Sequence, residues 1–379
     1  MVTVTHFFPA HGGGLELVAQ KLVSELATRG FSLHWFSSGT DDVPQLSAEN
    51  VTCTPVATTN LMERLTQLPY PLWSPGVLPR MWKAIGAADV VHVHEHLYAC
   101  SIIAVTIARM RSRPVVITQH MGALGLGNRV LTLCYEAGAR LLGALVFGAA
   151  TRAVFISANV RRFFSRDRNP SSLLIFNGID TERFTAAPPA QRQAVRERLG
   201  FPADRRVVLF VGRFVRKKGL HIINRLAQRF PEVLWVLVGS GPENPSQWGL
   251  DNVKLPGRVE HDSLPQYYQA ADLLLLPSSG EGFPLVVQEA LCCGLGVLST
   301  DEVATACPEA ESLIRAQPTP RVESDVDGWE DALRRVLADD AYLDARAARS
   351  ERARQLWSWA QCASLYAQLF RTVARKGFA

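Results

Sequence analysis

The sequence lacks an apolar run long enough to cross a membrane. Its longest candidate, residues 131–156, is broken by Glu136, Arg140 and Arg152, whereas a spanning helix needs about 20 predominantly apolar residues. The first residues carry no basic leader and reach the glycines at 12–14 at once, unlike a signal peptide. We therefore expect a chain that neither spans a membrane nor is secreted.

Cysteine is scarce and irregularly spaced. The seven residues include no C-x-x-C pair, and Cys292 and Cys293 are adjacent within an apolar helical run. An odd number at scattered positions makes neither a disulfide framework nor a zinc site. The pattern favours buried thiols in a reducing compartment, which predicts a cytoplasmic protein without a bound metal.

Charge is nearly balanced overall but not locally. The chain carries 40 basic and 35 acidic residues, a net charge of +5. Residues 109–168 contain ten arginines and only two acidic residues, Glu136 and Asp167. Such a stretch suits an anionic partner, either a lipid surface, a lipid-linked phosphate or nucleic acid. On the charge alone, an ordinary solvated surface is the favoured interpretation.

With 379 residues, the chain exceeds one ordinary core, and two domains are expected. Strand-like and helical runs alternate in two series, which predicts an α/β fold with two parallel sheets covered by helices. The strand-like runs are 2–7, 32–36, 90–93, 114–118, 153–156 and 173–176, then 206–211, 235–238, 271–276 and 296–299.

The proline-rich residues 186–205 are predicted to be a linker between the two series. The domains are thus residues 1–185 and 186–357, and the helical tail 358–379 is expected to return to the first domain. Two facing units of this kind leave a cleft at the carboxyl ends of their strands, where ligands bind.

A glycine cluster, Gly12–Gly14, lies between the first strand and the first helix. Glycine permits close backbone approach, and a helix amino terminus offers N–H groups to an anion. A tight turn needs glycine just as much, so a phosphate contact and a plain turn are equally good interpretations here.

A basic loop follows the first strand of the second series. Arg213 and Lys218 are five residues apart in the segment GRFVRKKG, which ends at Gly219 and enters a helix. A turning loop brings both cations to one point, and Arg binds phosphate oxygens in a bidentate manner. The loop is therefore predicted to bind a diphosphate.

Two glutamates follow a later strand of the same series. Glu281 lies in the loop and Glu289 lies eight residues on, inside an apolar helical run. That spacing is just over two helical turns, so both carboxylates can face one groove. Carboxylates accept hydrogen bonds from the paired hydroxyls of sugars and ribose.

Histidines mark the strand ends of the first series. His92, His94 and His96 alternate along one strand, and their positions favour strand-end polar groups over metal ligands. His120 follows the next strand, where a first-domain strand would meet the cleft. A glycine loop at 239–241 lacks a third glycine, because residue 244 is Asn, so a nicotinamide dinucleotide fingerprint is absent.

Four motifs, taken in order, resemble family 4 of the retaining GT-B glycosyltransferases. They are GG-x-E at 13–16, I-x-NGID-x-x-x-F at 175–184, GRFV-x-x-KG at 212–219 and E-x7-E at 281–289. The resemblance covers roughly residues 2–300. It implies two Rossmann-like domains, an active site in the cleft, a nucleotide-sugar donor, and no cofactor or obligatory metal.

The resemblance also implies roles for individual residues. Arg213 and Lys218 would hold the donor diphosphate, Glu281 the sugar hydroxyls and Glu289 the ribose. His120 would contact the donor sugar near its anomeric carbon. The remaining contacts, largely through the backbone, would come from Gly13, Gly14, Gly282, Phe283, Pro284, Leu285, Arg258 and Val259.

The chain departs from the family pattern after Thr300. The family commonly has a glycine-rich turn leading into a proline-glutamate pair, whereas this chain reads DEVATACPEAE. Donor-sugar contacts from this loop therefore cannot be carried over. A second departure, GLGVLS in place of glycine-x-proline, is compatible with the same strand.

The resemblance to this family suggests a role for the basic residues in the stretch 109–168. Members that modify lipid-linked acceptors dock through the first domain, and Phe163 and Phe164 are flanked by arginines that suit an anionic membrane. These arginines are residues 161, 162, 166 and 168. A second candidate surface is the aromatic and proline-rich segment 68–82, expected to be a loop.

The expected function is transfer of a hexose from a UDP- or GDP-linked sugar to a glycan or polyprenyl-linked acceptor, in polysaccharide, lipopolysaccharide or glycolipid assembly. The enzyme would be cytoplasmic or peripheral at the inner membrane face. The alternatives are a nucleotide-sugar epimerase, for which the first domain offers only Asp89 and Glu95, and a non-catalytic nucleotide-sugar binding protein. Nucleic-acid binding has only the charge in its favour. Donor, acceptor, linkage and oligomeric state stay open.

Overall fold

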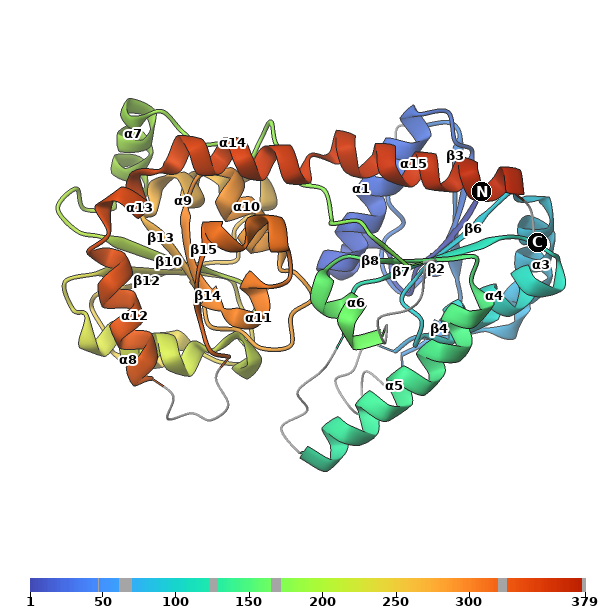
Figure 1. Ribbon diagram of the computed structural model, residues 1–379, viewed down its shortest axis with the longest axis horizontal. Helices are drawn as coiled ribbons and strands as arrows, with labels where there is room; N and C mark the ends of the chain where they lie inside the picture. The colour runs from blue at the N-terminus through green and yellow to red at the C-terminus, as the bar shows by residue number, and fades with distance from the viewer. Residues whose placement is uncertain (47, 61–69, 123–128, 165–171, 320–325, 377–379) are drawn as a thin grey trace. The chain divides into compact units, whose positions relative to one another are not determined.

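The computed structural model describes residues 1–46, 48–60, 70–122, 129–164, 172–319 and 326–376. The chain forms two compact units: unit 1 is Met1–Gly178 with Trp359–Ala379, and unit 2 is Ile179–Ser358. Each is built around a parallel sheet with helices on both faces (Figure 1). The predicted pair of parallel α/β units is confirmed.

The unit 1 sheet has seven parallel strands in the order β3-β2-β1-β6-β7-β8-β9. Its central strands are buried on both faces, which is why they are mostly apolar and β-branched, with the buried His92 and His94 of β6 as polar exceptions. The strands are β1 (Val2–Val4), β2 (Leu33–Ser38), β3 (Val51–Val56), β6 (Val91–His94), β7 (Val115–Gln119), β8 (Arg152–Phe155) and β9 (Ser172–Leu174). A separate antiparallel pair joins β4 (Thr58–Thr59) to β5 (Leu72–Trp73).

Helices cover both faces of the unit 1 sheet (Figure 1). The first and last helices of the chain share one face, where Tyr366 and Phe370 join the same core as Trp35. The other face carries the core around Met81, Ile85 and Ala104. The helices are α1 (Gly14–Thr28), α3 (Leu78–Ala87), α4 (Ala99–Met110), α5 (Arg129–Ala149), α6 (Ala158–Phe164) and α15 (Trp359–Lys376), with short 3-10 turns at Pro9–His11 and Pro75–Val77.

The unit 2 sheet has six parallel strands in the order β12-β11-β10-β13-β14-β15. The strands are β10 (Val207–Val211), β11 (Leu234–Val238), β12 (Val253–Gly257), β13 (Leu273–Leu276), β14 (Gly296–Thr300) and β15 (Ile314–Gln317). The helices are α7 (Pro189–Leu199), α8 (Leu220–Arg229), α9 (Leu264–Ala270), α10 (Leu285–Cys292), α11 (Asp301–Ala304), α12 (Asp327–Leu337), α13 (Asp340–Asp344) and α14 (Arg346–Trp357). Short 3-10 turns lie at Arg216–Lys218, Pro245–Trp248, His261–Ser263 and Pro308–Leu313.

Three expectations about local structure can now be compared with the fold. The segment 70–82 is not a loop, because it contains β5 and the start of α3, and Trp73 is buried while Tyr70 donates a hydrogen bond to Leu97 O. The six cysteines that the structure describes are free thiols, and all but Cys53 are buried. Within the described residues, no helix is both long and apolar enough to span a bilayer.

The predicted linker at 186–205 does not connect the units, because the chain passes from unit 1 to unit 2 at Gly178–Ile179, and the segment contains α7 within unit 2. Arg192 and Arg196 on α7 make ion pairs of 2.6 and 3.1 Å with Asp272, which is buried at the start of β13. Asp272 also accepts the N–H of Val207 at 2.7 Å. Two arginines therefore neutralise one buried carboxylate, and they fix α7 to the sheet without an apolar stripe.

The ion pair of Arg196 with Asp272 makes a testable contribution to stability. Arg196→Ala leaves a buried carboxylate with one partner fewer, so we expect the free energy of unfolding to fall by about 3–5 kcal/mol. Arg198→Ala, on the exposed side of the same helix, should change it by no more than about 0.5 kcal/mol. Urea denaturation measures both. Equal changes in the free energy of unfolding for the two variants would show that the buried ion pair contributes no more to stability than an exposed arginine.

Candidate functional site

The basic loop and the first glutamate of the E-x7-E motif meet in unit 2. They follow β10 and β13, which are neighbours in the parallel sheet, so their carboxyl ends lie side by side. Lys218 Nζ lies 2.8 Å from Glu281 Oε1, and both side chains are mostly buried. The structure thus brings together two residues that are 63 positions apart in the sequence.

Gly219 allows this close approach. It has φ +75°, and a Cβ atom there would lie 2.4 Å from Pro277 O, at the start of the loop that carries Glu281. Any other residue would push the basic loop away from β13. Arg213 lies on the same basic loop and is exposed, so its guanidinium is accessible to an anion beside Lys218.

Glu302 holds the loop that carries Glu281. Its carboxylate accepts the N–H groups of Gly280 and Glu281, each at 3.0 Å. Burial is the main cause that raises the pKa of Glu302. This residue lies in the segment that departs from the family pattern, and the sequence reasoning missed it because that segment gave no motif to align.

Glu289 is buried on α10 and has partners of its own. Its Oε2 accepts a hydrogen bond from the Tyr268 hydroxyl at 2.8 Å, and its Oε1 lies 3.0 Å from His261 Nε2. The bond to Glu289 raises the pKa of His261 above its ordinary value. Neither partner was predicted, since a Tyr inside a helix and a His in a turn carry no motif.

The other predicted residues of unit 2 lie beside Glu281 in the chain or follow the edge strand β12. Phe283 is buried and its ring meets Trp357 edge-on at 5.4 Å, so only its backbone can serve a ligand. Pro284 caps α10 and Leu285 begins it, while Gly282 is partly exposed. Arg258 is exposed and Val259 partly exposed after β12.

In unit 1, a carboxylate faces the glycine loop. Gly13 is the N-cap of α1, and a Cβ on it would lie 2.1 Å from Glu16 Oε2. Glu16 therefore folds back on the start of its own helix, and its Oε1 lies 3.1 Å from His6 Nε2. Because Glu16 complements the helix dipole itself, the geometry of Gly13 and Gly14 does not by itself favour a phosphate.

His120 lies at the end of β7 in a cluster of buried histidines. Its Nε2 is 3.0 Å from His94 Nδ1, and burial lowers the pKa of His120 to about 3, so the ring is neutral at pH 7. His92 contacts Thr118 Oγ1 at 2.8 Å, and His96 contacts Gln119 Oε1 at 2.8 Å. The alternating histidines thus have polar partners within the protein.

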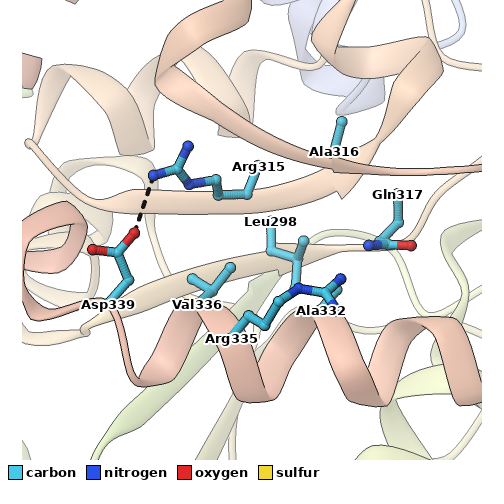
Figure 2. A pocket seen from close by; sticks show the side chains of 8 residues that line it. All are labelled: Leu298, Arg315, Ala316, Gln317, Ala332, Arg335, Val336 and Asp339. Atoms are coloured by element: carbon cyan, nitrogen blue, oxygen red, sulfur yellow. Dashed lines mark hydrogen bonds and ion pairs between the residues drawn. The ribbon is translucent and has the colours of Figure 1, made fainter.

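A pocket of about 280 Å³ lies elsewhere in unit 2, between β15 and α12. Figure 2 shows Arg315 paired with Asp339 on its wall, at 3.1 Å. None of the predicted site residues lines it. The candidate site is therefore the pair of loops that carry Lys218 and Glu281, and the pocket of Figure 2 is separate from it.

Two family models match the chain, one in each half. Residues 12–183 match "Glycosyltransferase Family 4" and residues 191–356 match "Glycosyl transferases group 1". Together they cover the chain except residues 1–11, 184–190 and 357–379, and the chain belongs to the group 1 glycosyltransferases. The resemblance drawn from the motifs is confirmed.

Individual relatives agree with this assignment. D-inositol 3-phosphate glycosyltransferase of Xylanimonas cellulosilytica is 27% identical over 96% of this chain and 93% of its own. Among solved structures, sucrose-phosphate synthase of Thermosynechococcus elongatus superimposes with a TM-score of 0.78 at 21% identity, covering 99% of both chains. HepE of Anabaena, solved in complex with UDP, gives a TM-score of 0.74 at 17% identity over 98% of this chain and 100% of its own. The predicted GT-B fold is confirmed.

The bond between His261 and Glu289 predicts a pH dependence. In Glu289→Gln the pKa of His261 should fall back toward about 6.5, because the charged acceptor is lost. The stabilisation from this bond is complete below pH 6.5 and is lost as pH rises through the raised pKa of His261. Since His261 is half-exposed, it amounts to less than about 1 kcal/mol.

Histidine proton NMR measures this shift, with His261→Gln to assign the signal. Glu260→Gln, an exposed neighbouring glutamate, is the matched control and should leave the signal in place. An unchanged pKa of His261 in Glu289→Gln would contradict the hydrogen bond.

Proposed function

We propose that this glycosyltransferase is a retaining enzyme that moves a hexose from a nucleoside-diphosphate sugar to a glycan or lipid-linked acceptor. The observation that carries the proposal is the ion pair of Lys218 with Glu281, with Arg213 on the same loop. A cation and a carboxylate held in contact can serve the two ends of one donor, its diphosphate and its sugar.

The diphosphate binds Lys218 and Arg213 in this proposal. The phosphate oxygens compete with Glu281 for the ammonium group of Lys218, so binding frees the Glu281 carboxylate to accept hydrogen bonds from the sugar hydroxyls. Both cations then stabilise the negative charge that grows on the diphosphate as it leaves. Two cations offset the charge of the diphosphate, so this charge balance does not require a metal.

Retention follows if the acceptor attacks from the face that the diphosphate leaves. The bond between the anomeric carbon and the phosphate oxygen breaks, the acceptor oxygen bonds to that carbon, and its proton passes to the leaving phosphate. We assign two roles to unit 1: His120 orients the sugar, and the backbone of Gly13 and Gly14 contacts the diphosphate, which requires the Glu16 carboxylate to move away from the start of α1.

Glu289 binds the ribose in the same proposal. Each of its oxygens already has one donor, Tyr268 or His261. A carboxylate oxygen has two lone pairs, so each can accept one ribose hydroxyl in addition. The backbone after β12, at Arg258 and Val259, is the expected contact of the base.

Thermal unfolding with UDP, GDP, ADP and their common sugars tests the donor site. A ligand at 100 times its Kd stabilises the protein by about 2.7 kcal/mol, and we expect one nucleotide to do so. Lys218→Ala should abolish this shift, because the phosphate loses its partly buried cation. Lys217→Ala, an exposed lysine of the same loop, should keep it. If no nucleotide shifts the transition, or if both variants respond alike, the proposed site is wrong.

The proposed acceptor is lipid-linked, and α5 supplies a surface for the membrane that carries it. Leu133, Leu141 and Leu145 are 66, 68 and 67% exposed on this helix. Their spacing of four to eight residues aligns them on one helical face. Exposed apolar faces of this size are unusual in water and mark interaction surfaces.

Basic residues flank this leucine face. Arg140 lies over the Phe163 ring at 4.5 Å, which ties α5 to α6, where Arg161 and Arg162 lie. Residues 129–164 contain five arginines and a single acid, Glu136. Apolar insertion beside positive charge fits an anionic bilayer. The other two arginines of the expected patch, Arg166 and Arg168, lie outside the described residues.

Sedimentation with phosphatidylglycerol–phosphatidylcholine vesicles tests this surface. We expect binding that weakens with salt and falls more than about tenfold in the double variant Leu141→Ser/Leu145→Ser, since each leucine loses about 2 kcal/mol of burial. Leu365→Ser, an exposed leucine on α15, is the control. Unchanged vesicle binding in the double variant, or a dimer that the same variant dissociates, would contradict the membrane assignment.

A further inference from the structure

Glu95 combines two features that are costly for a glutamate. It follows β6 with φ +66°, in the left-handed region, and its side chain is completely buried. A residue with a side chain is uncommon in that backbone region, and such positions persist only where the surroundings impose them. A buried carboxylate also loses its hydration.

The Glu95 carboxylate binds the end of the neighbouring strand, β7. Its Oε1 accepts the N–H of His120 at 2.7 Å and the N–H of Met121 at 2.8 Å. Its Oε2 accepts from Gln119 Nε2 at 2.6 Å, and the same amide group donates to Met121 O at 2.7 Å. Three consecutive residues, the last of β7 and the two that follow it, are thus fixed by one carboxylate, directly or through the Gln119 amide.

These contacts fix the backbone of His120, and His94 fixes its ring. The two rings lie nearly parallel, and the contact between His94 Nδ1 and His120 Nε2 is 3.0 Å. One proton between these nitrogens completes the hydrogen bond. The remaining nitrogen of His120, Nδ1, is then the one available to a ligand.

We propose that Glu95 is a positioning residue for His120. Its hydrogen bonds with the peptide N–H groups of His120 and Met121 weaken when the carboxylate takes up a proton. This inference rests on the role that the proposed function gives to His120. Glu95 itself touches neither substrate nor reacting atoms. It acts through the two peptide N–H groups, and a neutral carboxyl accepts them more weakly than an anion does.

The protonation of Glu95 falls in the physiological range. Burial raises its pKa to about 7, against the opposing effect of the three hydrogen bonds. The pKa values of His120 and His96 are lowered by burial. The other titratable groups that face Glu95 are Glu16, Tyr98 and Tyr135.

The direction of the pKa shift of Glu95 supports a functional role. An acid whose pKa is raised on folding destabilises the folded state as pH rises from its unfolded pKa to the raised value. Ionisation of Glu95 therefore lowers the stability of the folded protein as pH rises toward 7, although the ionised carboxylate accepts the two peptide N–H groups more strongly. Such a cost is consistent with a carboxylate that holds a functional loop.

A selective amide label reports directly on the hydrogen bond between Met121 and Glu95. The chain has only five methionines, and Met121 donates its own N–H to Glu95. With [15N]methionine, and Met121→Leu to assign the signal, we expect the Met121 amide to shift with a midpoint near pH 7. The shift should vanish in Glu95→Gln and persist in Glu49→Gln, an exposed glutamate of the same unit. A pH-independent amide in the unmodified protein would overturn the proposal.

The pH profile of turnover separates positioning from mere packing. With the nucleotide sugar that the thermal panel selects, kcat should fall about tenfold per pH unit below 7. In Glu95→Gln this fall of kcat below pH 7 should disappear. Its kcat at pH 8 should be at least tenfold lower, with KM for the donor little changed. Glu95→Asp should keep the fall of kcat below pH 7. A Glu95→Gln profile of unmodified shape would overturn the proposal. If no nucleotide sugar is turned over, the proposed function is wrong. The Met121 titration still tests whether protonation of Glu95 weakens its hydrogen bonds with the peptide N–H groups.

Discussion

Peptide N–H groups at the end of a buried parallel strand have no sheet partner, and both units of this protein satisfy them with a carboxylate from the neighbouring strand. In unit 1, Glu95 after β6 accepts two consecutive N–H groups beyond β7. In unit 2, Glu302 after β14 accepts two consecutive N–H groups beyond β13. Buried backbone donors are costly when unpaired, so each loop has one favoured position. The residues proposed to meet the donor sugar, His120 and Glu281, are members of these two pairs.

The same arrangement explains why Lys218 and Glu281 meet. Adjacency of β10 and β13 brings their loops to one edge of the sheet, and Gly219 lets the two loops touch. Glu302 then fixes the Glu281 backbone from the opposite side. A mostly buried ion pair supplies little net stability, because desolvation offsets the attraction. Its value is that the charges are already placed for an anionic ligand, which has to displace one partner and not reorganise the loop.

Much of this could be predicted from the sequence, because it depends on local pattern. Apolar runs of the central strands and helix periodicity correctly predicted these elements, and the structure brings Lys218 of the R-x4-K motif to Glu281 of the E-x7-E motif. The half-exposed edge strand β3 was missed because its polar residues and Pro55 obscure the pattern. The segment of α7 was interpreted as a linker with a charged helical turn, because the helix is anchored by charge, through Asp272, and has no apolar stripe. The partners Tyr268, His261, Gln119 and Glu302 depend on three-dimensional proximity, which no spacing rule encodes.

The two units divide the electrostatic work in a way that fits glycosyl transfer. Unit 2 offers exposed or partly exposed cations, Arg213 and Lys218, which suit a ligand of high negative charge. Unit 1 offers His120, which burial keeps neutral. A neutral imidazole can donate a hydrogen bond to a hydroxyl without attracting an anion, which suits the sugar contact proposed for His120. Burial of the histidine cluster therefore keeps His120 in the charge state that the proposed function requires, and the Glu95 carboxylate fixes the backbone of that residue.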